Sequence, residues 1–82
     1  MAENENSLIP LSKLLVGQKA LVVAFSFDSD KGERIEGIGV TPGEQLEIMR
    51  RVPGTPIEIK IRGYFVSLQE HEAEHIKVKL CL

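Results

Sequence analysis

The sequence has little cysteine, few aromatic residues and no long apolar run. Cys81 is the only cysteine among 82 residues, so no disulfide can form within the chain, and a lone thiol fits a reducing compartment. No apolar stretch approaches the roughly 20 residues that span a bilayer. The first residues, MAENENSL, are too polar and acidic for a signal peptide. We therefore expect a cytoplasmic protein without direct membrane insertion, which reaches a membrane only through a partner.

Net charge is also small. Ten Lys and Arg residues against twelve Asp and Glu residues leave a formal charge of -2, and aromatic residues make up 5% of the chain. A nucleic-acid-binding module needs a basic stripe interleaved with aromatic side chains. The composition provides neither, so we predict no nucleic-acid partner.

The sequence contains no recognisable catalytic constellation. The serines at positions 7, 12, 26, 29 and 67 have no histidine near them in sequence, and two histidines on one turn do not form a triad. The stretch GIGVTPGEQL, residues 37–46, begins like a dinucleotide fingerprint, but position 42 is a proline. Its glycines also lead into a strand, so no helix N-terminus would face a phosphate. We predict that the chain is not an enzyme and binds no nucleotide here.

The glycines of that stretch are better explained by chain geometry. Gly39 can take a positive φ angle at a helix end, while Pro42 and Gly43 fit the central positions of a type II turn. Gly63 separates the predicted strands 57–62 and 64–68, which indicates a turn between them. We interpret Gly39, Pro42, Gly43 and Gly63 as structural corners.

The apolar pattern predicts a mainly β domain. We expect strands over 18–27, 44–52, 57–62, 64–68 and 76–80, helical turns over 9–15, 32–39 and 69–75, and other turns over 28–32 and 53–56. Both faces of strand 18–27 should be covered, because it is apolar at both parities. About five short strands indicate a small barrel or sandwich. Residues 1–7 are expected to be a disordered tail, and 8–82 one domain.

Parity in the strands and helical spacing in the turns predict which side chains face the core. Phe65 is expected to face outward, because Val66 and Leu68 share the inward parity with its neighbour Tyr64. The inward set comprises Leu11, Leu14, Leu15, Ile35, Ile38, Leu46, Ile48, Ile57, Ile59, Ile61, Tyr64, Val66, Leu68, Ile76, Val78 and Leu80.

One candidate binding site lies at the end of a predicted strand. Met49, Arg50 and Arg51 precede the 53–56 turn, and methionine and arginine are enriched at protein interfaces. An outward Phe65 would add an apolar contact. The alternative is an ordinary solvated hairpin end, with Phe65 in a small apolar cluster under the terminal helix.

A second candidate site contains the two histidines. His71 and His75 are four residues apart, a helical spacing that can hold Zn²⁺ or Fe²⁺. Two nitrogens do not complete a tetrahedral site, and Cys81 is not obviously in reach. A solvated polar turn is the favoured interpretation, since a metal site would need completion by a partner or a second copy. A homo-oligomer is compatible with the sequence.

Four segments together resemble the FeoA family of ferrous iron transport proteins. They are LSKLLVGQKALV, RIEGIGVTPGEQLEI, PGTPIEIKIRGYFVSL and EAEHIKV, and the resemblance runs from about Leu8 to Leu80. It rests on Arg34, the run 39–43, the Pro-Ile pair at 56–57, Gly63 and the Glu-Ala pair at 72–73. One departure is Gln69, where the family commonly has arginine.

The resemblance implies a small SH3-like barrel with short helices and an accessory role in ferrous iron uptake. The implied partner is FeoB, a membrane iron transporter whose cytosolic part contains a G-protein domain, on which the chain would act as a protein-binding module. A metal-responsive domain that uses His71 and His75 is the alternative. A nucleic-acid-binding SH3-like module is a third, less favoured interpretation.

Overall fold

The fold is a single antiparallel sheet with short helical segments. The structure is a computed structural model and describes residues 8–26 and 34–81. Residues 34–37 are helical. The other elements are β1 (Ile9–Pro10), the 3-10 helix η1 (Leu11–Lys13), β2 (Lys19–Phe25), β3 (Gln45–Arg50), β4 (Ile57–Ile61), β5 (Tyr64–Leu68), α3 (Glu70–Ala73) and β6 (Ile76–Cys81).

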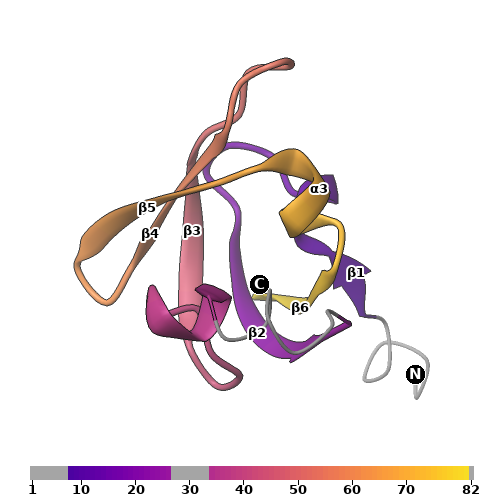
Figure 1. The fold of residues 1–82 in the computed structure, drawn as a ribbon, viewed down its shortest axis with the longest axis vertical. Helices are drawn as coiled ribbons and strands as arrows, with labels where there is room; N and C mark the ends of the chain where they lie inside the picture. The colour runs from indigo at the N-terminus through magenta and orange to yellow at the C-terminus, as the bar shows by residue number, and fades with distance from the viewer. Residues whose placement is uncertain (1–7, 27–33, 82) are drawn as a thin grey trace.

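The strands follow the order β1-β6-β2-β3-β4-β5, and every neighbouring pair is antiparallel. The register shifts within β2 and β3, between Val22 and Ala24 and between Ile48 and Arg50. Such irregularities bend a strand. Figure 1 shows the curled result, with β3, β4 and β5 on one side of β2 and with β6 and β1 on the other. This mainly β architecture confirms the predicted fold class, with six strands among the described residues where about five were expected.

The inward faces of the strands share one apolar core. Cross-strand register places Leu46 opposite Ile61 and Ile48 opposite Ile59, so alternate side chains of β3 and β4 meet on the same face. Ile38, Val66 and Leu80 are partly buried against this core. The buried set is Leu11, Leu14, Ala20, Val22, Ile35, Val40, Leu46, Ile48, Ile57, Ile59, Ile61, Leu68, Ala73, Ile76 and Val78, which confirms most of the inward assignments.

Two inward assignments, Leu15 and Tyr64, and the expected coverage of both faces of strand 18–27 were wrong. Leu15 is 65% exposed, because η1 ends at Lys13 and Leu14 is already extended, so helical spacing does not continue. The outer face of β2 is exposed at Leu21 and Val23, since no second layer covers that face in the described part of the chain. Tyr64 is 50% exposed because it lies beside the turn of the β4–β5 hairpin, which projects from the body in Figure 1.

The predicted corners have the backbone geometry that their residue types allow. Gly39 and Gly43 have φ angles of +97° and +96°, and the amide of Glu44 donates to the carbonyl of Thr41 at 3.1 Å, as in a type II turn. Arg62 also has a positive φ and joins Gly63 in the β4–β5 turn, so β4 ends one residue earlier than predicted. The tail 1–7 and the turn 28–32 lie outside the described residues.

Two arginines tie the helical segments to one another and to the sheet. Arg34 forms an ion pair with Glu72, whose other carboxylate oxygen accepts the backbone N–H of Gln69 at 2.9 Å. Arg51 donates to the carbonyl of Ser12 at 2.6 Å and lies 3.4 Å from the Glu70 carboxylate. Arg51 therefore fastens the end of β3 to η1 and α3.

Truncating the central one of the three core isoleucines of β4 should remove much of the total stability. Ile59→Ala deletes fully buried methyl groups, and we expect it to lower the free energy of unfolding by about 2–5 kcal/mol. Urea denaturation followed by circular dichroism measures the change. Lys60→Ala, the exposed neighbour on the same strand, is the control and should shift stability by less than about 0.5 kcal/mol. Equal unfolding midpoints for the two variants would contradict the assigned inward face.

The two adjacent arginines should differ in their effect on stability. Arg51→Ala leaves the Ser12 carbonyl without its donor, and we expect a loss of about 1–2 kcal/mol. Arg50→Ala is the matched control, because within residues 8–26 and 34–81 this exposed side chain forms no hydrogen bond or ion pair. Its effect should stay within about 0.5 kcal/mol. A larger loss from the Arg50 variant than from the Arg51 variant would refute the role given to Arg51.

Candidate protein-binding surface

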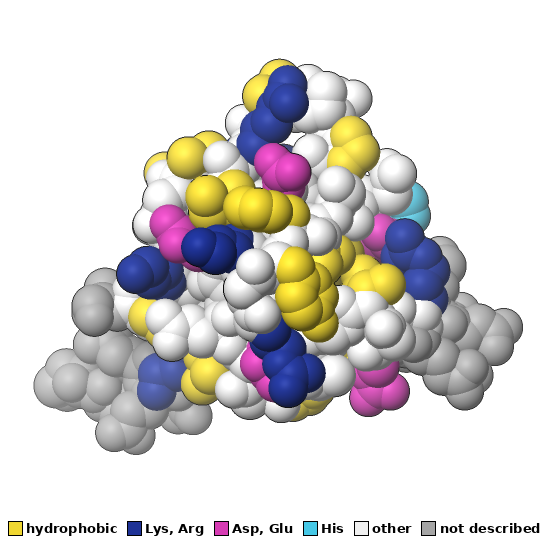
Figure 2. Space-filling model, turned by 90° about the vertical axis from the view of Figure 1, so that its left-hand side faces the viewer, with side chains coloured by type: hydrophobic (Ala, Val, Ile, Leu, Met, Phe, Trp, Pro, Cys, Tyr) yellow, Lys and Arg dark blue, Asp and Glu magenta, His cyan; other side chains and the backbone are white. Residues whose placement is uncertain are grey.

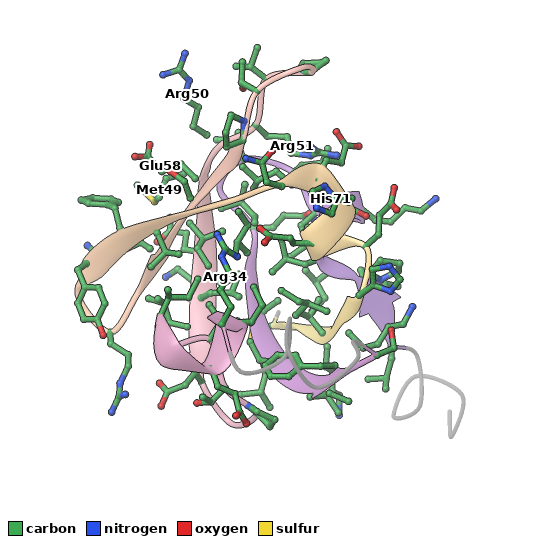
Figure 3. All side chains as sticks on the ribbon, in the orientation of Figure 1. Arg34, Met49, Arg50, Arg51, Glu58 and His71 are labelled. Atoms are coloured by element: carbon green, nitrogen blue, oxygen red, sulfur yellow. The ribbon has the colours of Figure 1, made fainter. Side chains whose placement is uncertain are left out.

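The bulge in β3 determines which side chains of this strand are exposed. Met49 falls between Ile48 and Arg50, where the register with β4 shifts. Because the bulge interrupts strict alternation, two consecutive residues, Met49 and Arg50, are both exposed. Figure 3 shows Arg50 pointing away from the body of the molecule. The bulge therefore presents one apolar and one cationic side chain side by side.

Arg51 is placed differently from its neighbour. Its side chain is only 21% exposed, and Figure 3 shows it directed toward α3. The Ser12 carbonyl and the Glu70 carboxylate occupy its guanidinium. Of the three residues singled out at the end of this strand, only Met49 and Arg50 are available to another molecule.

Two aromatic side chains are exposed on β5. Phe65 is 59% exposed and pairs with Lys60 on the outer face of the sheet, as its parity predicted. Tyr64 is exposed beside it, with its hydroxyl 3.2 Å from the position that a Cβ atom on Gly39 would take. Sequence parity missed this second aromatic, because parity alone does not show where a hairpin extends past the core.

Met49, Arg50, Glu58, Lys60 and Phe65, on β3, β4 and β5, form what we call the hairpin surface. The register places Arg50 opposite Glu58 and Lys60 opposite Phe65. Figure 2 shows this side of the molecule, where hydrophobic side chains gather near the middle among cationic and acidic ones. Three of its five residues, Met49, Arg50 and Phe65, are of types enriched at protein interfaces.

The hollows on this side are small and open. One of about 240 Å³ is lined by Lys19, Gln45, Leu46, Glu47, Lys60, Arg62 and Gly63. Another of about 280 Å³ is lined by Arg50, Thr55, Pro56, Glu58 and Ser67. Pockets for small molecules are mostly enclosed and apolar, whereas these two hollows are open to solvent and charged side chains contribute to both linings. The surface is therefore better suited to a protein partner than to a small ligand.

The two histidines lie in the segment that connects β5 to β6. His71 is on α3, while His75 lies past the last helical residue, Ala73, so the helical spacing does not extend across both. The Nδ1 atom of His75 is 3.4 Å from the Ser26 hydroxyl. Among the residues that the structure describes, no group of three or more His, Cys, Asp or Glu side chains could hold a metal ion.

The described chain has no helix of the length and apolar character needed to cross a membrane. A family model described as the FeoA domain matches residues 9–80. No curated protein sequence matches this chain.

Solved structures share this fold over nearly the whole chain. An iron uptake regulatory protein (FeoA) is 24% identical with a TM-score of 0.86, over 90% of this chain and 99% of that one. The FeoA-like protein from Clostridium acetobutylicum is 30% identical with a TM-score of 0.82, over 92% and 88%.

A third relative is the zinc complex of FeoA from Stenotrophomonas maltophilia, described as an SH3 domain protein. It is 22% identical with a TM-score of 0.71, over 83% of this chain and 86% of that one. The SH3-like fold expected from the resemblance is thereby confirmed. With the FeoA domain matched from residue 9 to residue 80, this chain belongs to the FeoA family, which is associated with ferrous iron transport.

Proposed function

We propose that this chain is a cytoplasmic accessory protein of ferrous iron uptake, which docks through the hairpin surface on the cytosolic G-protein domain of a FeoB-type transporter. The observation that carries the proposal is the exposed pair of Met49 and Arg50 at the β3 bulge, with Phe65 outward on β5. The family membership supplies the link to ferrous iron transport.

The hairpin surface has the composition of a protein contact. Phe65 is the largest of its apolar side chains and would lose its exposed area on docking, so we expect it to contribute most of the binding energy. Arg50, Glu58 and Lys60 surround it with charges of both signs. Such charges set the orientation and the rate of association more than the final affinity.

A regulatory effect requires unequal affinity for two states of the partner. A G-protein domain changes conformation between its GDP and GTP states. If the hairpin surface binds one state more tightly, docking shifts the equilibrium toward that state by the same factor. The barrel itself needs no catalytic group for this role.

The proposal predicts nucleotide-dependent binding to the transporter. Calorimetry with the full-length chain and the cytosolic domain of the transporter should give affinities that differ at least about fivefold between GDP and a GTP analogue. Phe65→Ser should weaken the tighter complex by about tenfold or more. Leu15→Ser, which removes an exposed apolar side chain outside the hairpin surface, should leave both affinities unchanged. No binding in either nucleotide state would refute the proposal.

Metal binding is a second candidate function, favoured by the zinc complex of the Stenotrophomonas maltophilia relative. His71 and His75 would be the ligands, with Zn²⁺ or Fe²⁺ bound and the set completed by another molecule. Because these two alone leave a tetrahedral site open, we expect no micromolar binding of either ion by calorimetry. Micromolar binding that is lost in the His71→Ala/His75→Ala variant would establish this function instead.

A further inference from the structure

One edge of the sheet is open along a whole strand. β5 pairs with β4 from Tyr64 to Leu68, and within residues 8–26 and 34–81 no strand pairs with its other side. Figure 1 shows β5 as the last strand on its side of the sheet. The opposite edge is β1, which has two residues and ends at Pro10. A short strand with proline is a protected edge, whereas β5 is a full-length one.

β5 lacks the features that usually protect an edge. Its sequence, YFVSL, contains no charged residue and no proline, and its register with β4 is regular from end to end. Edge strands avoid pairing with other chains through lysine, proline, bulges or inward charges. None of these occurs within β5, so its free backbone groups remain able to pair.

The β4–β5 turn determines which backbone groups point outward. Arg62 and Gly63 both have positive φ angles, the signature of a two-residue type I′ hairpin. Ile61 and Tyr64 flank this loop and form the first hydrogen-bonded pair, and antiparallel pairs then alternate. The amides and carbonyls of Phe65 and Ser67 therefore point to the open edge, while those of Val66 point to β4.

We propose that β5 pairs antiparallel with β5 of a second copy of this chain, with the two-fold axis at Val66. Phe65 of one copy then lies opposite Ser67 of the other. By symmetry, Ser67 of the first copy lies opposite Phe65 of the second. Both residues present free backbone groups, so each pair exchanges two hydrogen bonds. The two Val66 residues form the non-hydrogen-bonded pair between them, where side chains approach most closely.

The charges on β4 favour a second copy as the occupant. Lys60 pairs with Phe65 and Glu58 pairs with Ser67. In the dimer, two symmetry-related rows on the outer face therefore run from Lys60 through Phe65 to Ser67 and Glu58 of the other copy, whereas the row through Val66 begins and ends at Ile59. Each of these two rows has a lysine at one end and a glutamate at the other, and no like charges lie directly opposite one another, so the pairing avoids the like-charge repulsion that destabilises neighbouring strands. The sequence of β5 is thus complementary to itself in this register.

Sedimentation equilibrium of the full chain, with a chelator present to exclude metal bridges, tests the proposal. We expect the mass to rise to twice the monomer value as concentration increases toward about 1 mM, as for a small interface. Amide hydrogen exchange identifies the strand. Phe65 and Ser67 should become protected as concentration rises, whereas Val66 should be protected at every concentration.

Two variants of Ser67 test the backbone N–H donor of this residue, because one removes it and the other keeps it. Ser67→Pro removes the N–H that points to the edge, where proline is tolerated, and should weaken the dimer about tenfold or more. Ser67→Ala keeps the N–H and should dimerise as the wild type does. Ser67→Lys places a charge on the edge and should also be monomeric. This variant supplies the test if the proline variant fails to fold.

A monomer at about 1 mM, or a dimer that both the proline and lysine variants leave intact, would overturn the proposal. These measurements contain no transporter and do not rest on the proposed function. Their failure therefore leaves the docking of the hairpin surface unaffected, and loss of transporter binding leaves the β5 pairing unaffected.

Discussion

The packing of alternate side chains from β3 and β4 into one interior is the constraint on which the other features depend. Leu46, Ile48, Ile59 and Ile61 meet there in cross-strand register. The sheet is a single layer that curls around this interior, so the same alternation that buries one set of side chains exposes the other. The hairpin surface exists because the outward set on these strands has nothing of the described chain to cover it.

The ion pair between Arg34 and Glu72 joins the helical residues 34–37 to α3. Glu72 is buried at 8% exposure, and a buried carboxylate needs its partners. It receives one from Arg34 and one from the Gln69 backbone, within the capping box of α3. The two residues are 38 positions apart, and both belong to the segments that resemble the family. Their pairing explains structurally why both positions carry charged residues on a domain with an apolar interior.

The sequence predicted the strands well where alternation was clean, as in IEIKI, because burial of one face imposes a period of two. It failed where tertiary context decides. The apolar residues at both parities of β2 suggested two covered faces, yet Leu21 and Val23 are exposed on its outer face. For the candidate site, Arg50 and Arg51 are indistinguishable as neighbouring letters. Only the β3 bulge and the Ser12 carbonyl, 39 residues away in sequence, separate an exposed arginine from an engaged one.

β5 can contribute to both proposed contacts because each uses different groups. Docking uses the Phe65 side chain, which stands perpendicular to the sheet, whereas strand pairing uses the backbone groups in the plane of the sheet. Opposed residues in an antiparallel pair project to the same face, so a β5-paired dimer carries its two hairpin surfaces on one continuous face. A partner with two docking sites at matching separation would then be bound with greater avidity than a single surface provides, because the second contact forms at high effective concentration.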